Sequence, residues 1–219
     1  MTISAPPLPD AAMSQLARHA YDPSAASGSS DSHDWRYEMR RDMQQILPGV
    51  WLGPHHLSRD KEAMKAKGIT HMLCIRDPNE AQWVRCLHPN DFVYHLIEVT
   101  ESPLQNLIPY FPECRAFIDS CLGQGGSVFV HCSSAISRSP CFVVSYVMSS
   151  QNWPFQKAYS WVQNRRFCIN PSEGFKHQLK EYEPIWQANE NQTLRMYDDV
   201  QILQQGRLKR RMHGDPDEA

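Results

Sequence analysis

Features that direct proteins to membranes, to nucleic acids or out of the cell are missing from this 219-residue sequence. No apolar run reaches the length of about 18 residues that crosses a membrane, so we expect no membrane-spanning segment. The net charge is only −2, which gives no general affinity for nucleic acids. The chain does not open with a basic region followed by an apolar block, so the sequence predicts no secretory leader.

Regular cysteine and histidine spacing is also missing. The seven cysteines include no Cys-x-x-Cys pair, and the histidines show no paired spacing on one predicted helix, so we expect no metal and no cofactor. Cys74, Cys121 and Cys141 lie in or beside apolar runs. Cysteines in such runs are more often buried free thiols than disulfide partners, although pairing stays an alternative. Free thiols predict a reducing compartment, cytoplasmic or nuclear.

Both ends of the chain differ in composition from its middle. Residues 1–34 are rich in Ser, Ala, Pro and Asp and lack a sustained period, which is typical of a disordered tail. Residues 188–219 are polar and charged, with a basic cluster at 207–211 before an acidic end. The cluster is compatible with a nuclear localisation signal, but a solvated tail is the favoured interpretation. One domain is therefore expected, at 35–187.

Between the tails, short apolar runs alternate with amphipathic segments. The patterns predict strands at 50–52, 70–75, 92–99 and 127–130, and helices at 61–67, 104–122, 139–149, 155–165 and 172–186. Proline fits only the first turn of a helix, so the regular helix within 104–122 should begin near Pro109 or Pro112. Strands separated by helices predict an α/β domain with a mainly parallel central sheet and helices on both faces.

The most informative segment joins the last predicted strand to the helix after it. His131 and Cys132 follow the strand, and five residues separate the cysteine from Arg138. A loop that feeds a helix N-terminus directs backbone N–H groups at one spot, which suits a phosphate dianion and favours the thiolate of Cys132. The Arg138 guanidinium can bind two phosphate oxygens. This order is what a thiolate attacking phosphorus requires, whereas a buried cysteine and a surface arginine are the alternatives.

The segment resembles the signature loop of Cys-dependent protein phosphatases, in which His-Cys is followed by five residues, Arg, and Ser or Thr. The wider sequence is similar to the STYX branch of the dual-specificity phosphatases. Three further stretches carry the likeness: residues 39–54, 68–76 and 165–183. The resemblance spans about residues 35–187. It implies a small protein-tyrosine-phosphatase-like α/β domain with the signature loop at the carboxyl end of a central strand.

The resemblance also implies roles for individual residues. Cys132 would attack phosphorus and form a phosphocysteine, while Arg138 would stabilise the charge of the transferring group. Ser139 would donate a hydrogen bond to the sulfur, or else cap the helix. His131 would order the loop, or else be an ordinary histidine at a strand end. The phosphate-binding loop would consist of Ser133, Ser134, Ala135, Ile136, Ser137 and Arg138.

A phosphatase of this kind also needs a general acid for the leaving oxygen. The family places an Asp on the loop that precedes the long helix, and Glu101 falls on that position. Glu98, in the preceding strand, is a weaker candidate. Glutamate is one methylene longer than aspartate, and a misplacement of about 1 Å can reduce the rate about 100-fold. A solvated loop carboxylate is the alternative interpretation of Glu101.

The loop departs from the family pattern at two positions. Ser134 replaces an Ala, and Ala135 replaces a Gly. If position 135 requires a positive φ, alanine costs roughly 1–2 kcal/mol there. If it requires only a close approach to phosphate, the methyl group would crowd the ligand. By resemblance, STYX-type proteins are pseudophosphatases that lack the nucleophilic cysteine, keep the fold and bind phosphorylated or other protein partners.

Two functions from different classes follow. The first is a weak dual-specificity phosphatase that acts in signalling on phosphotyrosine, phosphoserine or phosphothreonine, and the intact Cys132, Arg138 and Ser139 favour it. The second is a catalytically poor module that binds phosphoproteins or, by family resemblance, a ubiquitin-ligase adaptor. Ala135 and Glu101 favour the second. We expect weak hydrolysis rather than none.

Overall fold

The computed structural model describes residues 35–102, 104–190 and 192. The tail predicted at 1–34 and the basic cluster at 207–211 lie outside the described residues. By internal contacts the chain divides into two units, residues 1–180 and residues 181–219. In the second unit, residues 181–190 are helical. The sheet and the site described below belong to the first unit.

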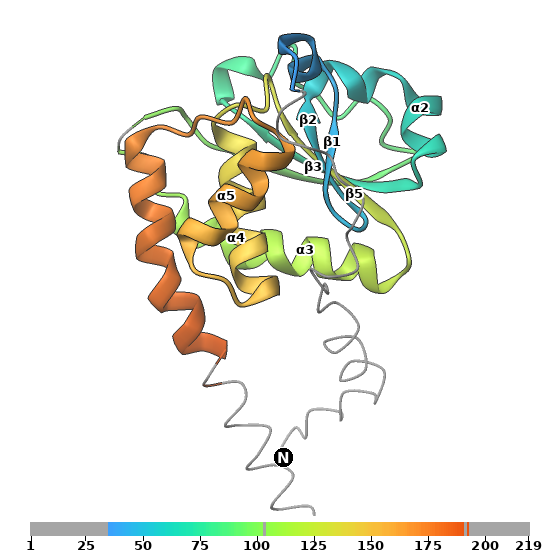
Figure 1. Ribbon diagram of the computed structural model, residues 1–219. Helices are drawn as coiled ribbons and strands as arrows, with labels where there is room; N and C mark the ends of the chain where they lie inside the picture. The colour runs from blue at the N-terminus through green and yellow to red at the C-terminus, as the bar shows by residue number, and fades with distance from the viewer. Residues whose placement is uncertain (1–34, 103, 191, 193–219) are drawn as a thin grey trace, which may run out of the picture. The chain divides into compact units, whose positions relative to one another are not determined.

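A five-stranded sheet forms the centre of the first unit (Figure 1). Its strands are β1 (Gln44–Leu47), β2 (Val50–Pro54), β3 (Ile69–Arg76), β4 (Val93–Glu98) and β5 (Ser127–Cys132), in the order β1-β2-β5-β3-β4. β1 pairs antiparallel with β2, and all other pairs are parallel. The mainly parallel sheet predicted from the alternating pattern is thus confirmed. The sequence does not predict β1, because its two buried residues, Ile46 and Leu47, are too few to form a periodic pattern.

Four α-helices and four short 3-10 helices complete the named elements of the described residues. They are α2 (Lys61–Ala66), α3 (Phe111–Gly123), α4 (Arg138–Gln151) and α5 (Phe155–Arg165), with η2 (Tyr37–Arg41), η3 (His55–Arg59), η4 (Pro78–Glu80) and η5 (Ile108–Tyr110). α3, α4 and α5 lie on one side of the sheet and α2 on the other (Figure 1). The predicted helices on both faces are therefore confirmed. Among the described helices, none is long and apolar enough to cross a membrane.

Helix boundaries follow the local chemistry with small shifts from the prediction. α3 begins at Phe111, directly after η5, so Pro112 stands in the first turn, where a proline is tolerated. α4 begins at Arg138, one residue earlier than predicted, and ends at Gln151. The last helix extends from 173 to 190, beyond the predicted end at 186.

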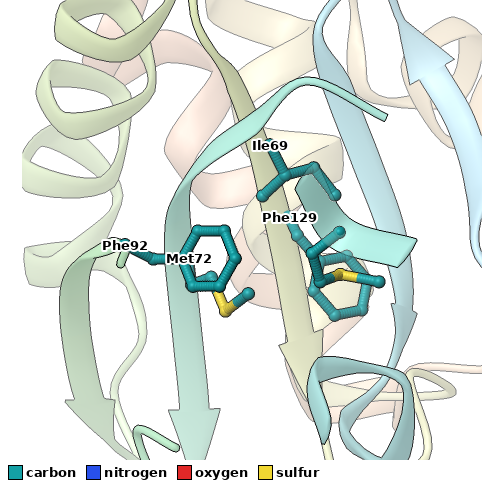
Figure 2. Close-up of a cluster of buried hydrophobic side chains, with 5 residues drawn as sticks. Ile69, Met72, Phe92 and Phe129 are labelled. Atoms are coloured by element: carbon teal, nitrogen blue, oxygen red, sulfur yellow. The ribbon is translucent and has the colours of Figure 1, made fainter. Parts of the chain in front are cut away.

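The two faces of the central strands bury different side chains. One cluster consists of Met64, Ile69, Met72, Phe92 and Phe129 (Figure 2). It seals α2 against the sheet. Because side chains alternate along a strand, Val128 and Val130 point to the opposite face, which α3 and α4 cover. A one-residue slip of β5 would turn Val128, Phe129 and Val130 to the wrong face, so core packing fixes the register in which β5 ends at Cys132.

The carboxyl ends of the four parallel strands meet at one edge of the sheet. β5 ends at Cys132 beside Pro54 of β2, and β3 ends at Arg76 beside Glu98 of β4. The segments after β3 and β4 carry Glu80 and Glu101. Ligands of open parallel sheets bind at this edge, so three segments that are distant in the sequence approach one candidate site.

Candidate active site

The sulfur of Cys132 is the centre of the candidate site. The residue is only 1% exposed and stands at the last position of β5. Its Sγ accepts a hydrogen bond from the backbone N–H of Ala135 at 3.2 Å and another from the hydroxyl of Ser139 at 3.2 Å. Hydrogen bonds are stronger when the acceptor is charged, so both donors are well placed to stabilise a sulfur that carries negative charge.

The loop turns at Ala135 through a left-handed conformation. Its φ is 54°, and among the described residues only Asn152 is another non-glycine with positive φ. The sequence left two roles open for this position, and the structure shows the first of them, a positive φ. An alanine there costs roughly 1–2 kcal/mol relative to glycine. This conformation directs the Ala135 N–H at the Cys132 sulfur, so the loop holds its donor at the expense of backbone strain.

Arg138 opens α4 and is paired with a carboxylate that the sequence did not indicate. Its Nη1 and Nη2 donate to the two carboxylate oxygens of Glu80, each at 2.7 Å, and Nη2 also donates to the Ser133 hydroxyl at 3.0 Å. Burial opposes ionisation of Glu80, but the hydrogen bonds from Arg138 and from the Asp77 backbone outweigh it and lower the pKa of Glu80. Glu80 therefore fixes the plane of the guanidinium by a two-point contact.

Glu101 lies at the same guanidinium on another edge. Its Oε2 is 3.7 Å from the Nε of Arg138, and its side chain is 43% exposed. Its Oε1 accepts a hydrogen bond from the Ser137 hydroxyl at 2.6 Å. Ser137 is the residue before α4, yet its side chain makes no helix-capping hydrogen bond. The hydroxyl instead holds the candidate acid beside the loop, within reach of solvent.

A second arginine, Arg166, supports the loop from its buried side and was not predicted as a site residue. Its guanidinium is fully buried and donates to the carbonyl oxygens of Ala135 at 2.9 Å and Ser134 at 3.2 Å. It also donates to the carbonyl oxygens of Arg40 and Asp42, both at 2.9 Å. The Gln44 side chain accepts from it as well. Arg166 thus joins the loop after Cys132 to η2, to β1 and to the residues between them.

Arg166 lies within residues 165–183, a stretch that the sequence singles out only because it resembles phosphatases. Burial lowers the pKa of Arg166. The five acceptors are four backbone carbonyls and one amide oxygen. Since these acceptors carry no formal charge, no local sequence pattern of opposite charges could have indicated them.

His131 stands beneath the loop and carries no hydrogen bond to it. The ring is fully buried, stacks on Phe129 at 5.2 Å between ring centroids and lies 5.1 Å from the His55 ring. Neither ring nitrogen has a hydrogen-bond partner among the residues that the structure describes. Burial, aided by the nearby His55, lowers the pKa of His131 to about 3. Any ordering of the loop by this neutral ring therefore acts through packing.

The remaining predicted loop residues are also placed. The Ile136 carbonyl accepts from the Asn170 N–H at 2.7 Å, and Ser134 is exposed. Within the described ranges, no three His, Cys, Asp or Glu side chains gather closely enough to hold a metal ion. The structure thus brings Cys132, Ser139, Arg138 and Glu101 to one place, and it leaves Glu98 at the end of β4, paired with Arg76 at 2.7 Å.

These groups can perform chemistry on a phosphate ester. A sulfur with two hydrogen-bond donors can act as a nucleophile, a guanidinium beside it can hold oxyanions, and a carboxyl group at the entrance can exchange protons with a leaving oxygen. Such a combination at the carboxyl end of a parallel strand is the arrangement of a phosphatase that works through cysteine.

Comparison with known proteins gives the same class. Residues 50–185 match the family described as "dual specificity phosphatase, catalytic domain", and the chain belongs to this family. The human serine/threonine/tyrosine-interacting protein is 42% identical over 187 residues, which are 82% of this chain and 81% of the relative. The dual specificity protein phosphatase 1B of Arabidopsis thaliana is 36% identical and covers 68% of this chain and 86% of its own length.

A solved structure agrees with the sequence relatives. The crystal structure of the human tyrosine phosphatase-like serine/threonine/tyrosine-interacting protein superposes with a TM-score of 0.65 at 42% identity. It covers 67% of this chain and 98% of its own. The resemblance to the STYX branch of the dual-specificity phosphatases, which the sequence predicts, is confirmed.

Proposed function

We propose that this protein hydrolyses phosphate monoesters on phosphorylated proteins, with Cys132 as the nucleophile. The observation that carries the proposal is the Cys132 sulfur, which accepts hydrogen bonds from Ala135 and Ser139 at 3.2 Å each. Membership of the dual specificity phosphatase family supports it. The substrates would be phosphotyrosine, phosphoserine or phosphothreonine residues of signalling proteins.

The proposed reaction has two steps. In the first, the Cys132 thiolate attacks phosphorus opposite the ester oxygen, so that an S–P bond forms, the P–O bond breaks, and Glu101 gives its proton to the leaving oxygen. In the second, water attacks phosphorus and gives a proton to Glu101, and the S–P bond breaks to release phosphate. Arg138 stabilises charge on the transferring group, and Ser139 stabilises the departing thiolate.

A reducing compartment suits this chemistry. All seven cysteines are free thiols, and Cys74, Cys114, Cys121, Cys132 and Cys141 are buried. An oxidised Cys132 could not attack phosphorus, because the thiolate is the nucleophile. We therefore propose that the protein works in the cytoplasm, the nucleus or both.

Hydrolysis of a fluorogenic aryl phosphate in reducing buffer at about pH 6 tests the proposal. Cys132→Ser serves as the blank and should abolish turnover. Glu101→Gln should lower kcat on the order of 10²–10⁴-fold for alkyl phosphates, whose leaving oxygen needs a proton, and far less for an activated aryl phosphate. Phosphate release that is equal in the wild type and in Cys132→Ser would contradict the proposal.

A second candidate function is binding without turnover, of a phosphoprotein or a ubiquitin-ligase adaptor. The observation that favours it is the positive φ of Ala135, 54°, in the loop that must hold the phosphate. A loop that stores roughly 1–2 kcal/mol at this residue can leave its donors imperfectly aimed at the ligand. Binding of a partner to such a loop would not require the Cys132 sulfur.

Ala135→Gly separates the two candidates. Glycine removes the strain, so we expect higher turnover if the loop conformation limits the rate. Asn152→Gly is the matched control, since Asn152 has a φ of 52° at the end of α4 and should leave turnover unchanged. Turnover that appears only in Ala135→Gly would identify a phosphatase disabled at one backbone position. Absence of turnover in the wild type and in Ala135→Gly, with partner binding that survives Cys132→Ser, would favour the binding function.

A further inference from the structure

The acid loop is the segment that carries Glu101, residues 99–102 and 104–107, and these residues form neither helix nor strand. The loop leaves β4 and enters η5. Its last residue, Leu107, is fully buried, whereas Leu104 is 95% exposed. Conformational entropy favours many arrangements of such an irregular and partly exposed segment. The loop therefore requires specific contacts if it is to hold Glu101 in one place.

Gln178, on the last helix, contacts the acid loop with both ends of its amide group. Its Oε1 accepts a hydrogen bond from the Leu107 N–H at 2.6 Å, and its Nε2 donates to the Gln105 carbonyl at 2.8 Å. One partner is a donor and the other an acceptor, so the amide fits in a single orientation. Phe175 and Leu179 on the same helix are fully buried, which anchors the helix in the core. Gln178 therefore ties the loop backbone to a fixed element.

The Gln105 side chain carries this constraint toward Glu101. Its Oε1 accepts hydrogen bonds from the Thr100 N–H at 3.1 Å and from the Thr100 hydroxyl at 3.3 Å. Thr100 is the residue before Glu101, whose carboxylate accepts from the Ser137 hydroxyl at 2.6 Å. A series of hydrogen bonds thus extends from Gln178 through Gln105 to the residue that precedes the candidate acid.

We propose that Gln178 is a positioning residue for the general acid, which holds the acid loop through Gln105 and so sets the distance between Glu101 and the leaving oxygen. The inference rests on the proposed function, because a general acid matters only if Cys132 attacks a phosphate ester. A carboxyl group must lie within hydrogen-bonding distance of the oxygen that it protonates. A misplacement of about 1 Å can reduce the rate about 100-fold.

A rate test compares two leaving groups in Gln178→Ala. An alkyl phosphate needs a proton on its leaving oxygen, whereas an activated aryl phosphate needs far less help. The ratio kcat/KM reports the steps up to phosphorylation of Cys132, in which the acid acts. We expect kcat/KM to fall about 10–100-fold for the alkyl phosphate and by less than about twofold for the aryl phosphate. An equal loss for both substrates would overturn the inference, because general damage to the fold does not distinguish leaving groups.

The pH profile provides a readout that a purely structural role would not change. For the alkyl phosphate, kcat/KM of the wild type should decline at high pH as the acid loses its proton, and this decline should flatten in Gln178→Ala. Gln105→Ala should show the same flattening. Gln156→Ala is the matched control, because it removes an exposed glutamine of α5 and should keep both the rates and the profile of the wild type. A wild-type profile in Gln178→Ala would contradict the positioning role.

Hydrogen exchange tests the same contacts without turnover. In the full-length Cys132→Ser protein, the Leu107 and Thr100 amides should exchange about tenfold faster after Gln178→Ala and at an unchanged rate after Gln156→Ala. Unchanged exchange in Gln178→Ala would overturn the inference even if the wild type hydrolyses both substrates. If exchange is faster but the wild type turns over neither substrate, the proposed function fails while the hold of Gln178 on the acid loop stands.

Discussion

Two arginines contact the same loop, and their surroundings differ in one respect. Arg138 is paired with carboxylates, Glu80 at 2.7 Å and Glu101 at 3.7 Å. Arg166 is fully buried and donates only to uncharged acceptors, among them the carbonyls of Ser134 and Ala135. One guanidinium lies among charged groups, and the other lies among backbone dipoles.

The difference separates ligand binding from support. A guanidinium paired with a half-exposed carboxylate such as Glu101 can exchange that partner for the oxygens of an incoming phosphate, because both are oxyanions. A guanidinium whose donors are used by buried carbonyls cannot leave them, since each carbonyl would lose its hydrogen bond out of reach of water. Arg138 is therefore the group suited to bind an oxyanion ligand, and Arg166 the group that maintains the shape of the loop.

The strongest test of this comparison is Arg166→Ala. The change removes hydrogen bonds to four backbone carbonyls and leaves them buried, so we expect the free energy of unfolding to fall by about 3–5 kcal/mol. Urea unfolding at neutral pH measures the loss. Arg165→Ala is the neighbouring control, because that guanidinium lies 3.2 Å above the Trp161 ring at the surface of α5, and its removal should cost about 1 kcal/mol. Similar losses in both variants would refute the supporting role.

Glu80→Gln tests the other arginine. Gln keeps the shape of the side chain but removes the charge that compensates Arg138, whose side chain is only 9% exposed. We expect the free energy of unfolding to fall by about 2 kcal/mol at neutral pH. Glu98→Gln is a matched control, because Glu98 pairs with Arg76 at 2.7 Å but is 45% exposed, and surface pairs contribute about 0.5 kcal/mol or less.

The pH dependence of the Glu80 effect has a definite sign. The folded protein holds the pKa of Glu80 below its ordinary value of 4.5. A carboxyl group with a lowered pKa stabilises the folded state above the ordinary value, and this contribution disappears as the pH falls through the lowered pKa. The difference between the wild type and Glu80→Gln should therefore shrink below about pH 4.5. A difference that stays constant in acid would contradict the assignment.

A pH-dependent effect extends the comparison to His131, a buried ionisable group beneath the loop. Burial lowers its pKa from 6.5 to about 3, so the unfolded chain binds a proton between these values that the folded protein excludes. Stability must then fall as the pH falls below 6.5. We expect this residue alone to contribute a loss of roughly 2 kcal/mol between neutral pH and about pH 5.

The change in urea midpoint with pH measures this effect. In His131→Asn the slope of stability against pH should decrease, whatever the stability of the variant at neutral pH. His177→Asn, which replaces a histidine at an exposed position, serves as the comparison variant. An unchanged slope in His131→Asn would contradict the assignment, because it would mean that the His131 ring binds its proton at the same pH in the folded protein as in the unfolded chain.

Local patterns predicted most of the fold but not all of the site. Strands β3, β4 and β5 are rich in apolar and β-branched residues, so the sequence predicts them within two residues of their observed limits. Strand β1 is short and half polar, and it forms because it pairs with β2. The sequence likewise predicts the sequential loop from Cys132 to Ser139, whose groups are neighbours along the chain. It gives no indication of Glu80, which is separated from Arg138 by 58 positions.

The sequence by itself determined the order of the candidate site groups, because a strand, a five-residue loop and a helix place Cys132 and Arg138 around one spot whatever surrounds them. Only the tertiary structure decided how that spot is held and charged. The strand order β2-β5-β3-β4 brings Glu80 and Glu101 to the edge where β5 ends. Arg166 reaches the carbonyls of the loop and of the segment before β1, because buried backbone acceptors require a donor from wherever in the chain one can be supplied.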